Sequence, residues 1–265
     1  MEKSSRLRSP GSRRVLVVDD HSINREFLKS ALALEAFEVE EASSGPDAIA
    51  RCRLMEYDLI LMDLHMPGQD GIETAKAIQA LNAGSAKAGV IFLTADTRPE
   101  VHEQLSRAGF DRVLNKPLNV DTLIARLRGW DMLDCQSINP PRPSGTGLLI
   151  DDTAALATCN GQHELVARMK RMFADDLDQR LNALDQQIAR GDQAAAATIL
   201  HQWTGAASYA GASKLADRIQ RLQSTLHDQP STTSDRAELA DTYLAFMRCA
   251  RDTRAALSLD APSQA

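Results

Sequence analysis

Residues 59–73 read LILMDLHMPGQDGIE, an aliphatic run that ends in Asp63 and continues into a turn rich in proline and glycine. Such a run is typical of a strand buried on both faces of a parallel sheet. The strand candidates lie at 15–18, 38–42, 59–62, 90–93 and 112–114, and amphipathic helical segments follow them at 23–35, 46–55, 71–81, 99–108 and 120–130. Five such βα units predict a doubly wound, five-stranded parallel sheet with its site at the carboxyl ends of the strands.

The second half of the chain has no strand pattern. Residues 131–147 are rich in proline and glycine, which predicts a linker. Beyond it, apolar residues recur at helical spacing, at Leu165, Met169, Met172, Phe173, Leu177, Leu181, Leu184 and Ile188. Gly191 followed by Asp192 predicts a helix end and a new N-cap. Further helices are expected at 193–210, at 213–226 and, after a polar loop at 227–234, to about 257.

These patterns predict an α/β domain at 13–130 and an all-α bundle of four or five helices at 148–258. We expect disordered tails at 1–12, where the residues are basic, and at 259–265. The formal net charge of −6 and the lack of a basic recognition helix argue against nucleic-acid binding. No window reaches the ~18 continuous apolar residues of a membrane span. The scattered cysteines (Cys52, Cys135, Cys159 and Cys249) suggest neither disulfides nor a zinc site, so a cytoplasmic protein is expected.

Polar residues with a shared chemistry stand where the predicted strands end. Asp19 and Asp20 follow the first strand, Asp63 ends the third, Thr94 ends the fourth, and Lys116 follows the fifth. The carboxyl ends of parallel strands meet at one edge, so these side chains should converge. Three crowded carboxylates repel one another unless a hard cation such as Mg²⁺ lies among them. A carboxylate, Mg²⁺, an ammonium group and a hydroxyl are the groups needed for phosphoryl transfer to that carboxylate.

The segments VLVVDDHSINREF (15–27), LILMDLHMPGQDGIE (59–73), VIFLTAD (90–96) and VLNKPL (113–118) resemble the response-regulator receiver family, with its flavodoxin-like fold. The resemblance implies that Asp63 accepts a phosphoryl group, and that Asp20, Asp63 and the backbone carbonyl of His65 ligate Mg²⁺. It also implies that Asp19 acts through metal-bound water, and that Thr94 and Lys116 contact the phosphoryl oxygens.

Two further features follow from this resemblance. The bond between Lys116 and Pro117 is expected to be cis, as in the family. Val113 stands where receivers usually carry tyrosine or phenylalanine, so the usual switch between a threonine and an aromatic ring cannot operate unaltered.

A second motif, LHQWTGAA at 200–207, lies in a predicted helix. Leu200, Ala207 and Ala210 share the stripe that should face the bundle core, whereas His201 and Gly205 lie on an offset stripe and should be exposed. Glycine in mid-helix costs about 1 kcal/mol against alanine, which makes sense where another protein must approach the imidazole. An exposed imidazole is a competent phosphoryl acceptor near pH 7.

Together with GASKLADRIQRLQSTL (211–226), this motif resembles the histidine phosphotransfer (Hpt) domain. The resemblance implies that His201 carries a phosphoryl group. Thr204 departs from the family pattern, which has lysine at that position. The other interpretation is an ordinary surface histidine in a helical docking or dimerisation domain.

The sequence thus predicts a two-component phosphorelay protein in which phosphate passes between Asp63 and His201 and aspartates or histidines of partners. Expected partners are a sensor histidine kinase and other receiver or Hpt proteins. The sequence shows no glycine-rich ATP lid, so we expect no ATP-dependent kinase core. Because receivers catalyse their own phosphorylation and dephosphorylation, the sequence leaves open whether the chain is an enzyme. The alternative is a phosphorylation-gated adaptor or inhibitor whose helical domain docks without phosphotransfer.

Overall fold

The computed structural model describes residues 13–35, 37–81, 84–128, 148–227 and 233–259. They form two compact units, of which the first contains the residues up to Thr94 together with Arg98–Val113. The second contains Ala95–Thr97 and the residues from Leu114 onward. The predicted linker at 131–147 and the predicted tails, apart from Leu259 at the end of the last helix, lie outside the described residues.

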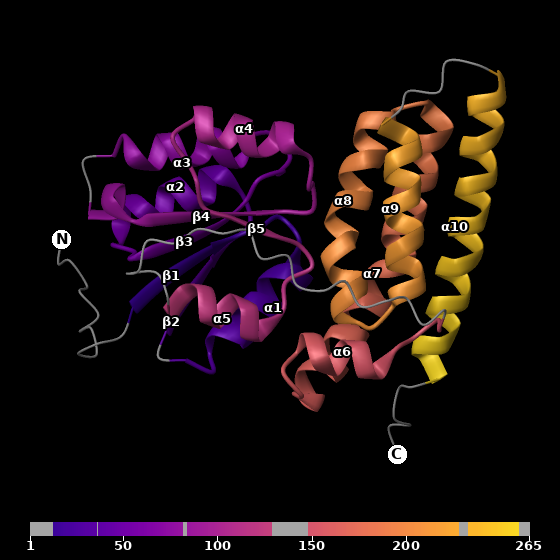
Figure 1. Ribbon diagram of the computed structural model, residues 1–265, viewed down its shortest axis with the longest axis horizontal. Coiled ribbons are helices and arrows are strands. Elements are labelled where there is room, and N and C mark those ends of the chain that lie inside the picture. Colours follow the sequence, from indigo (N-terminus) through magenta and orange to yellow (C-terminus); the bar gives the residue numbers. More distant parts are fainter. Residues whose placement is uncertain (1–12, 36, 82–83, 129–147, 228–232, 260–265) are drawn as a thin grey trace. The chain divides into compact units, whose positions relative to one another are not determined.

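The predicted five-stranded sheet is confirmed, with the strand order β2-β1-β3-β4-β5 (Figure 1). The strands are β1 (Arg13–Val18), β2 (Phe37–Ala42), β3 (Leu59–Asp63), β4 (Gly89–Thr94) and β5 (Val113–Asn115). β1 pairs in parallel with β2 and with β3, and β3 pairs in parallel with β4. The central strands of the sheet carry consecutive hydrophobic residues because helices cover both faces of the sheet. The sheet therefore brings the ends of β1 and β3 together.

Helices follow the strands along the chain and cover the sheet. They are α1 (Ser22–Leu32), α2 (Gly45–Leu54), α3 (Gly71–Gln79) and α4 (Pro99–Arg107), with a short 3₁₀ helix, η1, at Gly84–Lys87, and α5 (Val120–Arg128) follows β5. The Asp70 carboxylate accepts the Glu73 backbone N–H at 2.8 Å and so caps the start of α3. α2, α3 and α4 lie on one face of the sheet and share one hydrophobic core, whereas α1 lies on the other face (Figure 1).

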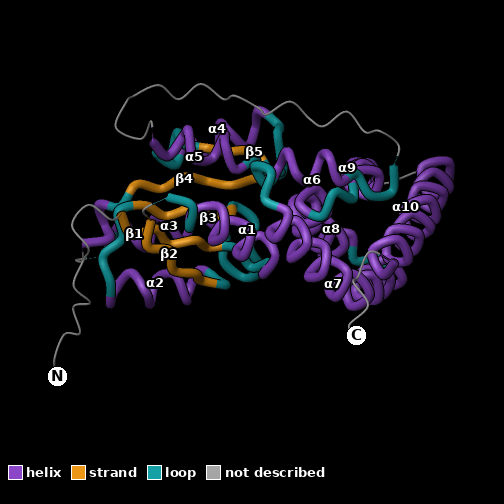
Figure 2. Tube along the Cα trace, turned by 90° about the horizontal axis from the view of Figure 1, so that it is seen from below, coloured by secondary structure: helices purple, strands orange, loops and turns teal. Residues whose placement is uncertain are grey.

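The described residues from 148 to 259 contain four long helices and one short one, which form the helical unit. They are α6 (Asp152–Thr158), α7 (His163–Arg190), α8 (Gln193–Tyr209), α9 (Ser213–His227) and α10 (Thr233–Leu259). The long helices run side by side in both views (Figures 1 and 2). The predicted stripe on α7 is buried, apart from Met172 and Ile188, which are half-buried. The predicted turn is confirmed: Gly191 has a φ of 71°, and Asp192 caps α8 by accepting the Ala195 backbone N–H at 3.0 Å.

Aromatic side chains fill the centre of the bundle. Trp203 and Phe246 are fully buried, and their ring centroids lie 6.0 Å apart. The indole N–H of Trp203 donates to the Asp176 carboxylate at 3.3 Å, which satisfies its polar atom inside the core. α8 packs against α6, α7 and α9. Among the described residues, no helix combines the length and the apolar character needed to cross a bilayer.

Candidate functional site

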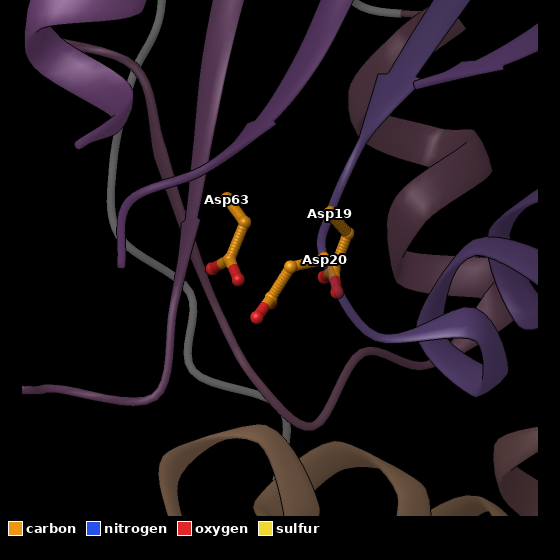
Figure 3. Close-up of side chains that lie close together, drawn as sticks. All are labelled: Asp19, Asp20 and Asp63. Atoms are coloured by element: carbon orange, nitrogen blue, oxygen red, sulfur yellow. The ribbon is translucent and has the colours of Figure 1, made fainter. Parts of the chain in front are cut away.

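The carboxyl ends of β1 and β3 hold a cluster of three carboxylates. Asp19 and Asp20 follow β1 and Asp63 ends β3; one carboxylate oxygen from each lies within 4.8 Å of the others. Figure 3 shows the three side chains directed into one space. Asp19 and Asp63 are buried and Asp20 is half-buried. The predicted convergence of these three residues is confirmed, and oxygen donors crowded in this way fit a hard divalent cation such as Mg²⁺.

The start of α1 holds the Asp19 carboxylate in place. Its Oδ1 atom accepts the backbone N–H of His21 at 2.9 Å and the Asn24 side-chain amide at 3.1 Å. The Arg25 guanidinium donates to the main-chain oxygen of Asp19 at 2.7 Å. Hydrogen bonds from fixed donors allow a carboxylate to stay charged in a buried position. Neither Asn24 nor Arg25 was predicted from the sequence; the available signal was their place at the start of the helix that follows Asp19.

The remaining receiver-motif residues follow their predicted strands. Thr94 ends β4 and is fully buried, and Lys116 directly follows β5 and is buried. The bond between Lys116 and Pro117 is cis, as expected. The His65 side chain is exposed beyond the end of β3. It stays a prediction that the His65 carbonyl is a metal ligand. The contact of Thr94 and Lys116 with a phosphoryl group also stays a prediction.

The turn between β3 and α3 requires glycine at two positions. Gly68 has a φ of 85°, a left-handed conformation that favours glycine. At Gly71 the chain passes close to the Asp63 backbone, and the Gly71 N–H donates to the Leu64 carbonyl at 2.9 Å. This turn therefore fixes the end of β3 from which the Asp63 side chain extends.

His201 differs from its predicted environment. Leu200, Ala207 and Ala210 are buried as predicted, but His201 is also buried, with 9% of its surface exposed. The prediction of an exposed imidazole is therefore wrong for this structure. Every residue from 200 to 207 is buried, so burial on α8 is not limited to the stripe predicted to face the core.

Thr204, one turn after His201, is directed inward. It is 2% exposed, and its hydroxyl lies 3.4 Å from the Leu200 carbonyl oxygen and 3.5 Å from the Gln223 amide oxygen on α9. Near the same turn, Gln202 contacts Arg180 of α7, which forms an ion pair with Asp176 at 2.7 Å. Position 204 thus carries no positive charge, and the nearby guanidinium is paired with a carboxylate.

Two protein families match separate parts of the chain. The response regulator receiver domain matches residues 15–128, and the Hpt domain matches residues 168–257. Among curated proteins, the sensor protein GacS of Pseudomonas syringae pv. syringae is 28% identical over 251 residues, which cover 91% of this chain and 27% of the relative. The sensor histidine kinase AruS of Pseudomonas aeruginosa is 30% identical over 216 residues, covering 79% of this chain and 20% of the relative.

The chain therefore spans about a quarter of the length of these curated relatives, or less. Two similar solved structures each match less than half of the chain. The chemotaxis protein CheY4 of Vibrio cholerae is 30% identical, with a TM-score of 0.42, and the match covers 44% of this chain and 98% of that one. The receiver domain of the Pseudomonas aeruginosa sensor histidine kinase PA1611, solved with a magnesium ion in its active-site cleft, is 28% identical, with a TM-score of 0.42, and the match covers 45% and 98%.

Proposed function

We propose that the chain, separate parts of which match the response regulator receiver domain and the Hpt domain, acts as a phosphorelay protein of a two-component system. In this role Asp63 accepts a phosphoryl group, and His201 receives it from, or donates it to, an aspartate. The observation that carries the proposal is the cluster of Asp19, Asp20 and Asp63, in the domain of the chain that precedes the Hpt match.

Each residue of the first site has a distinct part in this proposal. Asp20, Asp63 and the His65 carbonyl would hold Mg²⁺, and Asp19 would hold one of its waters; bound there, the ion neutralises charge on the phosphoryl group. An Asp63 carboxylate oxygen is the nucleophile. The Thr94 hydroxyl donates a hydrogen bond to one phosphoryl oxygen, and the Lys116 ammonium neutralises another.

Transfer of the phosphoryl group from a phosphohistidine to Asp63 is a simple displacement. The Asp63 oxygen forms a bond to phosphorus while the bond between phosphorus and the imidazole nitrogen breaks, and the electron pair of that bond stays on the nitrogen. A proton on the other ring nitrogen makes the departing ring a neutral imidazole. The reverse step returns the phosphoryl group to the ring, so the direction depends on positioning and on the partners.

The proposed source of the phosphoryl group is a histidine kinase, because the relative AruS is named as a sensor histidine kinase. Other receiver or Hpt proteins are the proposed acceptors, in the cytoplasm.

A second candidate function is a phosphorylation-gated adaptor. The burial of His201 and the presence of Thr204 at the usual lysine position favour it. In that case the helical domain docks on a kinase or a receiver without taking phosphate.

The experiment compares the wild-type chain with Asp63→Asn, His201→Ala and Thr204→Lys. Acetyl phosphate should produce hydroxylamine-sensitive label in the wild type and none at the receiver of Asp63→Asn. Phosphorylated receivers, including this chain's own, should give base-stable label to wild type but not to His201→Ala. The lack of one exposed charge at position 204 should raise the barrier to transfer by of order 1 kcal/mol. In Thr204→Lys the long lysine side chain can place its ammonium group at the surface, so transfer should be several-fold faster.

Two outcomes would decide against the relay. Full receiver labelling in Asp63→Asn means that the phosphoryl acceptor lies elsewhere. If neither wild type nor Thr204→Lys takes phosphate from any donor while the chain still binds a kinase or receiver, the adaptor function replaces the relay.

A further inference from the structure

Asn24 is a buried polar side chain that the phosphoryl chemistry above does not use. It lies in the first turn of α1 and is 2% exposed. Its amide nitrogen donates to Asp19 Oδ1 at 3.1 Å, while its amide oxygen has no hydrogen-bond partner within the described part of the chain. A buried acceptor without a partner costs about 1–3 kcal/mol, so its presence calls for an explanation.

The fold by itself does not favour asparagine here. Asparagine is a weak helix former, and the neighbouring positions Ile23, Phe27 and Leu28 are buried and apolar. Position 24 does not cap the helix, because the N-cap residue of α1 is His21. An apolar residue at position 24 would remove the unpartnered amide oxygen, at the loss of one hydrogen bond to Asp19.

The orientation of the amide follows from its partner. The Asp19 carboxylate can only accept hydrogen bonds, so the NH₂ group of Asn24 must face it and the amide oxygen must occupy the other branch. That oxygen is therefore an unused acceptor beside a carboxylate whose Oδ1 atom already receives two hydrogen bonds.

We propose that Asn24 is a positioning residue of the Mg²⁺ site. Its NH₂ group fixes the Asp19 carboxylate, and its Oδ1 atom accepts a hydrogen bond from a water molecule held beside the ion by Asp19. Mg²⁺ keeps several waters when it binds to few carboxylates, and partners that orient a ligand are often as important as the ligand. This inference rests on the proposed function, because Asn24 would orient the groups that hold Mg²⁺ in the same site.

The test measures the dissociation constant of Mg²⁺ by calorimetric titration of the full chain. Asn24→Leu, which keeps the size but removes both polar groups, should weaken Mg²⁺ binding about tenfold or more. Ser85→Ala is the control, because it removes a buried hydroxyl that bonds to Tyr57 and Met55, near the start of β3. It should leave the Mg²⁺ affinity unchanged.

A double-mutant cycle tests whether Asn24 acts through Asp19. In an Asp19→Asn background, the further change Asn24→Leu should weaken Mg²⁺ binding by less than twofold, since coupled residues are not additive. Thermal unfolding without metal establishes that each variant folds, and Asn24→Ala replaces Asn24→Leu if the latter does not.

The outcomes separate the two ideas. A folded position-24 variant that binds Mg²⁺ as tightly as wild type overturns the role of Asn24, and so does full additivity in the cycle. A wild-type chain that binds no Mg²⁺ contradicts the proposed metal site itself.

Discussion

The backbone of Gly71 lies against that of Asp63, and a Cβ atom added to Gly71 would stand 2.3 Å from the main-chain oxygen of Asp63. Gly71→Ala must therefore displace the end of β3. We expect this variant to be less stable by about 1–3 kcal/mol and to be phosphorylated by acetyl phosphate at least tenfold more slowly. Urea unfolding and the rate of labelling measure the two effects.

Gly109→Ala is the matched control for Gly71→Ala. Gly109 has a φ of 88°, but apart from its own chain neighbours no atom of the described residues lies within 4 Å of an added Cβ. The control should lose about 1 kcal/mol through backbone strain and keep its labelling rate. A Gly71→Ala chain that is labelled at the wild-type rate contradicts the expected displacement.

The acidic cluster should destabilise the chain when no cation is present. Asp20→Asn removes one of three negative charges within 4.8 Å of one another. In EDTA its free energy of unfolding should exceed that of the wild type by about 1 kcal/mol. Added Mg²⁺ should stabilise the wild type more than the variant, because the ion binds the folded state. Denaturation with and without Mg²⁺ checks both signs, and an equal response to Mg²⁺ would remove Asp20 from the metal site.

The burial of His201 predicts slow chemical modification. Diethyl pyrocarbonate should carbethoxylate His201 more slowly than the exposed His163 and His227, which lie in the same helical unit. Peptide mass spectrometry over time gives the three rates side by side. Equal rates would mean that the face of α8 bearing His201 is open in solution.

Two buried thiols should make the folded chain sensitive to alkali. Burial raises the pKa of Cys52 to about 11 and that of Cys159 to about 12, from an ordinary value of 9.0. The folded state therefore keeps these protons at a pH where the unfolded chain has lost them. Their contribution to stability is complete below pH 9 and falls as the pH rises from 9 toward 12, by up to about 1.4 kcal/mol per thiol and pH unit.

Cys159→Ala tests this dependence. The difference in free energy of unfolding between wild type and variant, measured from pH 8 to pH 10.5, should shift against the wild type above pH 9. If the two stabilities stay parallel across this range, the thiol does not titrate as its burial requires.

Phe246 should hold α10 to the bundle. Its ring is fully buried beside Trp203 and lies 6.5 Å from the ring of Tyr243. Phe246→Ala should cost about 3–5 kcal/mol of stability. Leu244→Ala on the same helix is the control, because Leu244 is 53% exposed and its loss should change stability by less than about 0.5 kcal/mol. Equal losses in chemical denaturation would contradict this packing of α10.

Local signals in the sequence predicted most of the fold. The apolar runs and the intervals between them predicted the five-stranded sheet. Gly191 and Asp192 predicted the turn between α7 and α8. The convergence of Asp19, Asp20 and Asp63 followed from topology alone, because parallel strands end at one edge.

Features that apolar spacing does not specify could not be predicted in this way. A helical wheel gives the direction of His201 on α8 but not what covers that direction, so its burial was missed. The hydrogen bond between Asn24 and Asp19 depends on the path of the chain from β1 into α1. The end of α1 was also placed too late, since apolar spacing continues past Leu32, where the helix ends.

The strand order determines how late the acidic cluster can form when the chain folds. Val15 of β1 must find Leu59 of β3 across a long stretch of chain, whereas two residues alone, Gly191 and Asp192, join α7 to α8. Closing a long loop costs more entropy than closing a short one, and contacts between distant residues slow folding. A refolding chain should therefore build the helical hairpin that bears His201 before it completes the edge that bears Asp63.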